Sequence, residues 1–445
     1  MRAEDWVEGL APRLPSMQHE HAVEASRGRM AELGLAAYAD ARLDWSRAGA
    51  VFGSLQRRAR SLSSSKRRFL MDQVSFLVRR ERTISLLLDL AGLPESANRA
   101  RVERARYLAA GVLYGGLRAE EIEWQGPFLD WEVVADPAHS LRGWVLQSVP
   151  SRAEQLARLG SLPDWLAERL LLLPDPAGLV RALNERGPLC LRANRPAGDR
   201  ASLLEELEGA EACRLARDGL RLPGHSDAHA LAPLKEGRAD IQDEGSQLIA
   251  ELCAPQAGER IIDACAGALG KSLALASLQQ DQGSIVATDV RGDALRRGLK
   301  RARRAGYRSI RTVPVGSVRG PADLVLVDAP CSGTGALRRR PWTRWSMHLA
   351  DLQRLTGEQS ALLDRAAGWV AEGGRLVYAT CSLLAEENDD VVEGFIDRHP
   401  DWRLAPASDY LGTERADQIG DRGVLRLLPH QHGTDGFYAA VLTRT

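Results

Sequence analysis

From Ile241 onward, apolar strand-like runs alternate with helical segments, and this alternation constrains the fold more than any other feature of the chain. The expected strands are Arg260–Ala264, Ser284–Thr288, Leu324–Val327 and Leu376–Tyr378, and the expected helices are Lys271–Gln279 and Ala294–Ala305, the latter followed by Gly306 as its C′ residue. Strands separated by helices pair in parallel and form a doubly wound, Rossmann-like α/β sheet. The run Gly436–Leu442 is expected to close this sheet as an edge strand.

Two further parts precede this α/β domain of residues 241–445. Residues 1–145 carry apolar and basic residues at three- and four-residue spacing, as in Ser64–Leu90 and Arg99–Tyr114, which predicts a helical domain. Residues 146–240 predict a linker and a small α/β module with strands at Leu189–Asn194 and Leu220–Leu222.

The charge of the chain is balanced, with 59 basic and 59 acidic residues among 445. Nucleic-acid binders often have a basic excess, so the balanced charge is mild evidence against such a function. The local distribution of arginines matters more than their total number. The clusters at 57–60, 66–68 and 296–304 are read as solvated helix faces, although the stretch 57–68 is also a candidate for contacting a phosphate backbone. The run Arg338–Arg340, with Arg344, begins seven residues after Cys331, where we expect a polyanionic substrate to pass.

The sequence favours a cytoplasmic protein. No apolar run reaches membrane-spanning length, and Met1–Trp6 lacks the apolar core of a secretory signal. The six cysteines form no CxxC pair, which argues against a zinc site and against a disulfide framework. Of these cysteines, Cys190, Cys213 and Cys253 are expected to be small buried apolar residues.

The other notable cysteines follow two of the expected strands. Cys331 stands in Asp-Ala-Pro-Cys after one strand, and Cys381 stands in Thr-Cys-Ser after another. In a parallel sheet the carboxyl ends of strands meet at one edge, where ligands bind. The sequence therefore predicts two thiols near each other at a ligand site.

A glycine-containing turn upstream has the outline of a nucleotide-type cofactor site. It consists of Cys265, Ala266, Gly267, Ala268, Leu269, Gly270 and Lys271, between an expected strand and an expected helix. Glycine allows the backbone to approach a ligand closely, and Asp289 ends the next strand, at the spacing where an acid meets ribose hydroxyls. The turn is neither G-x-G-x-x-G nor a Walker motif, so a nicotinamide cofactor is disfavoured.

Together these segments resemble the RNA cytosine-C5 methyltransferases of the Sun/Fmu group. The resemblance is carried by the turn Asp263–Ser272, the intact D-A-P-C-S-G-T-G of Asp328–Gly335, the T-C-S of Thr380–Ser382 with Glu386-Glu387-Asn388, the lead-in Ile241–Gln247 and the terminal Asp435–Tyr438. It is strong over 241–445 and fair over about 160–240, where the family has a small RNA-recognition-like module. Over the first 140 residues it is faint and compatible with a NusB-like helical RNA-binding domain.

The resemblance implies S-adenosylmethionine as methyl donor and a covalent mechanism on a cytosine base. Cys381 would add to carbon 6, Asp328 would hydrogen-bond the ring and also line the donor site, and Cys331 would help the adduct resolve. Lys271 and nearby arginines are candidates for keeping the Cys381 thiol ionised in a partly exposed, electropositive setting. Cys265 is read as loop packing that presents backbone to the donor.

Three positions depart from the family pattern. Gly267, Ala268 and Leu269 replace Ala-Pro-Gly, so a larger side chain is expected where the loop meets the donor's methionine end. Ser317 stands where an acid is usual near the adenine or ribose, and Trp342 replaces an acid on the substrate side.

Ribosomal RNA is the substrate that the resemblance favours, with transfer RNA as the alternative. An alternative of another class is a non-catalytic RNA-binding or ribosome-assembly factor that kept the fold, favoured by the altered turn and Ser317 and opposed by the intact cysteine motifs. DNA is disfavoured because the nucleophile of DNA methyltransferases normally comes from the Pro-Cys motif. A monomer is expected.

Overall fold

The computed structural model describes residues 7, 10, 19–223, 226–228, 230–419 and 423–444, so Met1–Trp6 lies outside the described residues. The chain divides into two compact units. The helical unit comprises Met1–Arg186 and Leu337–His348, and the sheet unit comprises Gly187–Ala336 and Leu349–Thr445. None of the described helices is long and apolar enough to span a bilayer.

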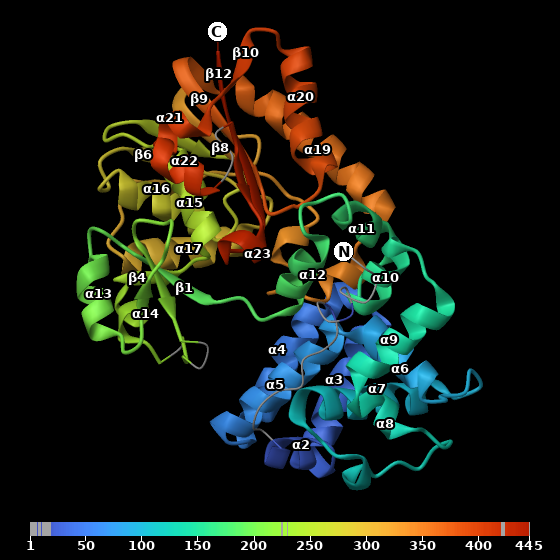
Figure 1. Cartoon of the computed structure of the whole chain (residues 1–445). Coiled ribbons are helices and arrows are strands. Elements are labelled where there is room, and N and C mark those ends of the chain that lie inside the picture. Colours follow the sequence, from blue (N-terminus) through green and yellow to red (C-terminus); the bar gives the residue numbers. More distant parts are fainter. Residues whose placement is uncertain are drawn as a thin grey trace. The chain divides into compact units, whose positions relative to one another are not determined.

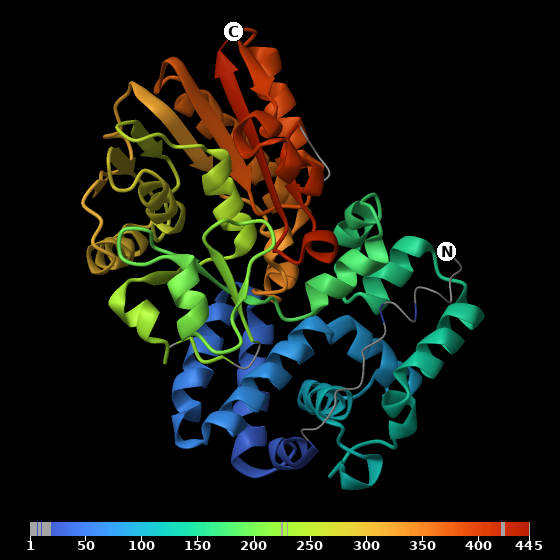
Figure 2. The ribbon, with the colours of Figure 1, turned by 60° about the vertical axis from the view of Figure 1, so that its left-hand side comes forward.

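The helical unit is built from short and medium helices, as the spacing of its apolar residues predicts. They are α2 (His19–Ala25), α3 (Gly28–Leu43), α4 (Ala48–Arg58), α5 (Ser64–Arg79), α6 (Glu81–Leu90), α7 (Arg99–Gly115), α8 (Trp131–Ala135), α9 (Pro137–Ser148), α10 (Arg152–Leu159), α11 (Asp164–Leu170), α12 (Pro176–Asn184) and α18 (Thr343–Ser346), with 3-10 turns at Trp45–Arg47, Ala59–Ser61 and Ala119–Glu121. Helices α3, α4 and α5 pack side by side (Figures 1 and 2). Gly116 caps the C-terminal end of α7, and its φ of 70° is left-handed and favours glycine.

A small antiparallel sheet opens the sheet unit. Its strands are β1 (Leu189–Ala193), β2 (Glu211–Ala212), β3 (Gly219–Leu222) and β4 (Ala239–Ile241), in the order β2-β3-β1-β4, accompanied by α13 (Arg200–Glu206) and α14 (Ala232–Glu236). Leu191, Leu203 and Leu220 belong to the core that joins α13 to this sheet. Strands β1 and β3 lie where the sequence predicts strands, whereas residues 146–186 belong to the helical unit.

The large sheet positions the candidate site. Its elements are α15 (Glu244–Leu252), β5 (Arg260–Asp263), α16 (Gly270–Leu278), β6 (Ser284–Ala287), α17 (Gly292–Arg304), β7 (Ile310–Thr312), β8 (Ala322–Asp328), the 3-10 turn Thr334–Ala336, α19 (Leu349–Ala367), β9 (Val370–Thr380), the 3-10 turn Ala385–Glu387, α20 (Asp389–Arg398), β10 (Trp402–Ala405), α21 (Ala407–Leu411), α22 (Thr413–Ile419), β11 (Leu425–Leu427), α23 (Pro429–His432) and β12 (Phe437–Arg444). The strand order is β10-β12-β9-β8-β5-β6-β7, with β11 beside β12.

Alternate residues of the central strands face two separate cores. Ile261, Leu324 and Leu326 belong to the core with α15 and α16, whereas Ile262 and Val325 belong to the core with α19 and α20. Successive side chains of a strand point to opposite faces, so near-continuous apolar runs fit a sheet covered by helices on both sides (Figure 1). The parallel pairing of β7, β6, β5, β8 and β9 confirms the predicted Rossmann-like fold.

The last strand lies elsewhere in the sheet than expected. Strand β12 pairs antiparallel with β9 on one side and with β10 on the other, so the prediction of an edge strand is wrong. The strand that takes the outer position, β10, has only four residues, and its two central ones are exposed. Such a short run gives little apolar signal in the sequence.

Candidate active site

The two cysteine motifs meet at the carboxyl ends of β8 and β9. The Sγ atoms of Cys331 and Cys381 lie 3.4 Å apart, and both side chains are partly exposed. The backbone joins the two turns, because the Gly335 N–H donates to the Cys381 carbonyl at 2.9 Å. Neighbouring parallel strands thus bring together the thiols that the sequence predicts to be close.

A partly buried ion pair lies beside the thiols. Lys271, in the first turn of α16, donates from Nζ to Asp328 Oδ2 at 2.7 Å. Its side chain is 10% exposed, against 30% for that of Asp328, so the carboxylate keeps access to solvent. Charges in such a setting interact more strongly than they do in water.

The two thiols titrate differently. The hydrogen bond from Cys331 lowers the pKa of the Cys381 thiol, and Lys271 acts in the same direction, against burial and the charges of Asp328 and Glu387. The same hydrogen bond, burial and the charges of Cys381 and Glu387 raise the pKa of Cys331. A thiolate is the nucleophilic form of cysteine, so this arrangement favours Cys381 as the nucleophile and Cys331 as a proton-bearing neighbour.

The predicted cofactor turn lies between β5 and α16. The Gly267 N–H donates to Asp289 Oδ2 at 2.7 Å, so the turn and the acid after β6 are adjacent. Asp289 also accepts from Arg291, whose Nε lies 3.0 Å from Oδ1, and Arg291 is a partner that the sequence analysis missed. Cys265 is half-buried, and burial raises the pKa of its thiol to about 12, in keeping with a packing role. Ser317 is exposed in the turn after β7.

Leu269 does not present its side chain to the turn's open side. It is 0% exposed and belongs to the core with Leu273 and Leu295. A Cβ on Gly298 of α17 would lie 2.4 Å from Leu269 Cγ, so the glycine at 298 leaves the room that the leucine fills. The expectation of a larger side chain toward the donor is therefore wrong, although Leu269 does have a left-handed φ of 63°.

The replacement Leu269→Gly tests this arrangement. We expect the free energy of unfolding to fall by about 1–2 kcal/mol, because losing a buried leucine outweighs relief of the left-handed backbone. The Kd for S-adenosylmethionine, measured by calorimetry, should stay within about threefold of that of the original chain, because the substitution changes no atom that faces the donor. A loss of about 1.4 kcal/mol in binding free energy would raise the Kd tenfold. Tighter donor binding in the variant would contradict this account. Gly298→Ala is the matched control: it crowds the same contact and should weaken donor binding.

The segment 337–348 follows the Cys331 turn but belongs to the helical unit. Arg344 is 1% exposed, and its guanidinium donates to Asn184 Oδ1 at 2.7 Å and to the carbonyls of Ser161 and Leu183 at 3.0 and 3.3 Å. Trp342 stacks on Phe52 of α4 with ring centroids 5.1 Å apart. The prediction that Arg344 meets a polyanionic substrate is therefore wrong. Arg338 is also buried, at 7% exposed, whereas Arg339 and Arg340 are exposed.

Arg344→Ala should destabilise the helical unit by about 3 kcal/mol, because it leaves buried carbonyls and Asn184 without their donor. The measurement is the urea midpoint followed by tryptophan fluorescence. Arg340→Ala removes an exposed arginine from the same segment and should change stability by less than about 0.5 kcal/mol. Equal midpoints for the two variants would contradict the assigned role of Arg344.

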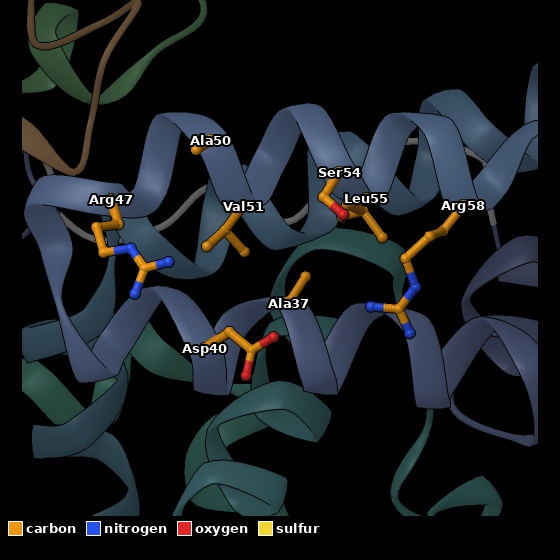
Figure 3. Close-up of a pocket in the computed structure, with 8 residues that line it drawn as sticks. All are labelled: Ala37, Asp40, Arg47, Ala50, Val51, Ser54, Leu55 and Arg58. Atoms are coloured by element: carbon orange, nitrogen blue, oxygen red, sulfur yellow. The ribbon is translucent and has the colours of Figure 1, made fainter.

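The helical unit also contains a pocket between α3 and α4. It has a volume of about 200 Å³ and is lined by Ala37, Asp40, Arg47, Ala50, Val51, Ser54, Leu55 and Arg58. Arg47 and Arg58 lie at its two ends with Asp40 between them (Figure 3). The pocket holds none of the predicted catalytic or cofactor-binding residues, but Arg58 belongs to the basic stretch 57–68. On α17, by contrast, Arg296, Arg297 and Arg303 are exposed opposite a buried face, as a solvated helix face predicts.

The family of the chain is shown by its similarity to ribosomal RNA methyltransferases. The model of the 16S rRNA methyltransferase RsmB/F family matches residues 250–443. A probable ribosomal RNA small subunit methyltransferase B of Synechocystis is 31% identical over 86% of this chain and 92% of its own length. The Citrobacter koseri ribosomal RNA small subunit methyltransferase B is 35% identical over 63% of this chain and 66% of its own length.

A solved structure, a methyltransferase homolog protein from Pyrococcus horikoshii, matches with a TM-score of 0.57 and 26% identity, over 66% of this chain and 99% of that one. The chain belongs to the RsmB/F family of ribosomal RNA methyltransferases.

Proposed function

We propose that the chain methylates carbon 5 of cytosine in ribosomal RNA through a covalent adduct with Cys381. The observation that carries the proposal is the thiol pair, with 3.4 Å between its sulfur atoms, beside the Lys271–Asp328 ion pair. Carbon 5 of cytosine is a poor nucleophile. Addition of a thiolate to carbon 6 makes carbon 5 an enamine carbon, and covalent catalysis of this kind divides one difficult step into easier ones.

The residues of the β5–α16 turn fit S-adenosylmethionine. Asp289 is a carboxylate suited to ribose hydroxyls, the Gly267 backbone lies against it, and Leu269 is packed away from the turn's open side. When bound, the donor supplies an electrophilic methyl group on a sulfonium. Arg291 would have to share Asp289 with the ribose.

Each residue beside the thiols has one task in this proposal. The Cys381 thiolate forms a bond to carbon 6, and Asp328 hydrogen-bonds the ring, so that electron density gathers at carbon 5. After methylation, a water molecule takes the carbon 5 proton, the electron pair of that C–H bond re-forms the C5–C6 double bond, and Cys381 leaves carbon 6 as a thiolate. Cys331 assists this step by donating a hydrogen bond to the leaving sulfur. Lys271 holds Asp328 through their ion pair, and its charge favours the thiolate form of Cys381.

The RNA would be held outside this site by phosphate contacts, with a base from a single-stranded or loop region entering it. The exposed arginines of α4 and the turn after it (Arg57, Arg58 and Arg60) are the candidate contacts on the helical unit. A NusB-like role for that unit and an RNA-recognition role for the small module remain part of the proposal, as do a cytoplasmic location and a monomeric state.

The test is incorporation of a labelled methyl group from S-adenosylmethionine into transcribed small-subunit ribosomal RNA, with transfer RNA as the parallel substrate. We expect label in ribosomal RNA, none in transfer RNA, and none with Cys381→Ser. Label in transfer RNA alone would mean that the substrate is transfer RNA and not ribosomal RNA. Binding of either RNA without any incorporation would support the non-catalytic alternative and contradict the proposal.

A further inference from the structure

Asp289, the acid proposed to bind the donor's ribose, has every acceptor position of its carboxylate filled. Its Oδ1 accepts from the backbone N–H of Arg291 at 2.7 Å and from Arg291 Nε at 3.0 Å. Its Oδ2 accepts from the Gly267 N–H at 2.7 Å and from Arg291 Nη2 at 3.2 Å. A carboxylate has about four lone-pair positions for hydrogen bonds, so these four bonds use all of them.

The four bonds are of two kinds. Two come from backbone N–H groups, that of Gly267 in the β5–α16 turn and that of Arg291, which follows Asp289 by two residues and forms a local turn with it. The other two come from the guanidinium of Arg291, with one on each oxygen. Of these partners, the guanidinium alone can leave Asp289 without movement of the backbone.

The exposure of the two side chains shows which one is free to move. The side chain of Asp289 is 5% exposed, whereas that of Arg291 is 67% exposed. Arg291 thus covers the acid on the side of the solvent. An arginine that projects so far into water loses no buried contact when it rotates away, and the ion pairs of such exposed side chains are weak.

Gly267 leaves the room in which the guanidinium lies. A Cβ on this residue would lie 3.2 Å from Arg291 Nη2, which is shorter than an optimal contact of about 3.5–4.0 Å between side-chain atoms. The family pattern that the chain resembles has alanine here, so the methyl group that would crowd the arginine is missing. One departure of the cofactor turn therefore coincides with the bonds from Arg291 to Asp289.

The ribose of the donor needs acceptor positions that the arginine holds. Each ribose hydroxyl that donates to Asp289 requires one lone-pair position on the carboxylate. With the two backbone bonds in place, two positions are left, and both are occupied by the guanidinium. The arginine side chain and the ribose hydroxyls therefore compete for the same acid.

We propose that the guanidinium of Arg291 takes the place of the donor's ribose on Asp289 and has to leave before the donor binds, so that Arg291 limits the affinity for S-adenosylmethionine. This role rests on the proposed function, which assigns Asp289 to the ribose. The backbone N–H groups of Gly267 and Arg291 stay on the carboxylate and hold it in position. Removal of the arginine side chain should therefore strengthen donor binding, whereas removal of a residue that holds the donor would weaken it.

The experiment is calorimetric titration of the full-length chain with S-adenosylhomocysteine, which is the donor without its methyl group. This probe lacks the sulfonium charge, so the loss of one positive charge from the protein affects it little. In Arg291→Ala the Kd should fall about fivefold, or about 1 kcal/mol, the size expected for an exposed ion pair. Arg291→Lys keeps the charge but lacks the planar fork that holds both oxygens, so its Kd should lie between the two.

Two controls separate competition at Asp289 from a general effect of charge. Arg296→Ala removes an exposed arginine of α17 that pairs with Asp293 rather than with Asp289, and its Kd should equal that of the original chain. Asp289→Asn should weaken binding. Arg291→Ala added to that variant should bring no gain, because the ion pair is already lost.

An unchanged or higher Kd in folded Arg291→Ala, or an equal gain in Arg296→Ala, would overturn the inference. If Arg291→Ala does not fold, Arg291→Lys decides, and an unchanged Kd there would overturn it as well. Absence of binding in both the original chain and Arg291→Ala would count against the inference and the proposed donor site together. Tighter binding in Arg291→Ala, combined with no methyl transfer to RNA by the original chain, would support the inference and count against the proposed function alone.

Discussion

Cys381→Ser should lower the rate of methyl transfer by roughly ten-thousandfold or more, the size of loss seen when a catalytic nucleophile is removed. Cys331→Ala should behave differently. Its Cys381 thiol can still add to the base, but the adduct resolves slowly, so a covalent complex of protein and RNA should accumulate. The measurement is a single-turnover assay combined with denaturing electrophoresis of labelled RNA.

Cys253 provides the control for these variants, because it is a cysteine buried in the core that takes no part in the site. Cys253→Ala should keep methyl transfer and form no stable complex. A covalent complex that forms in Cys381→Ser would contradict these roles. If it forms there and not in Cys331→Ala, then Cys331 is the nucleophile and Cys381 is the thiol that resolves the adduct.

Lys271→Met should lower methyl transfer at pH 7, because losing the lysine raises the pKa of the nucleophile and leaves less of it as thiolate. The hydrogen bond from Cys331 and then the charge of Lys271 lower the pKa of Cys381, so removing the lysine raises it. The rate should therefore climb with pH through a higher inflection than in the original chain. The variant should recover part of its activity at pH 9.

The control for this variant is Lys300→Met, which removes an exposed lysine of α17 in the same unit. Its pH–rate profile should coincide with that of the original chain. A Lys271→Met profile with the same inflection and a uniformly lower rate would assign Lys271 to orienting Asp328 rather than to keeping Cys381 ionised.

Much of the large sheet was predictable because its strands are buried on both faces. The runs Leu324–Val327 and Leu376–Tyr378 are continuously apolar, which marks central parallel strands. The place of β12 was not predictable, because its neighbour β10 has only four residues with two of them exposed. The order of antiparallel strands at the end of a sheet depends on such weak segments.

The cysteines of the site were predictable for a topological reason, whereas side-chain directions were not. Any parallel sheet brings strand ends to one edge, so Cys331 and Cys381 were expected there, and the pairing of β8 with β9 places them next to each other. Whether Leu269 points to the turn or to the core depends on Gly298, which lies on the next helix. In the same way, the sequence shows Arg344 only as one more positively charged residue in an arginine cluster. Its burial depends on carbonyl groups of the helical unit that accept its hydrogen bonds.

The most direct test of the central claim is the identity of the nucleoside that receives the methyl group. Small-subunit ribosomal RNA treated with the chain and a labelled donor would be digested to nucleosides and analysed by liquid chromatography and mass spectrometry. The account predicts that the label is in 5-methylcytidine, with none formed by Cys381→Ser. Label in any other nucleoside, or 5-methylcytidine formed equally by Cys381→Ser, would contradict it.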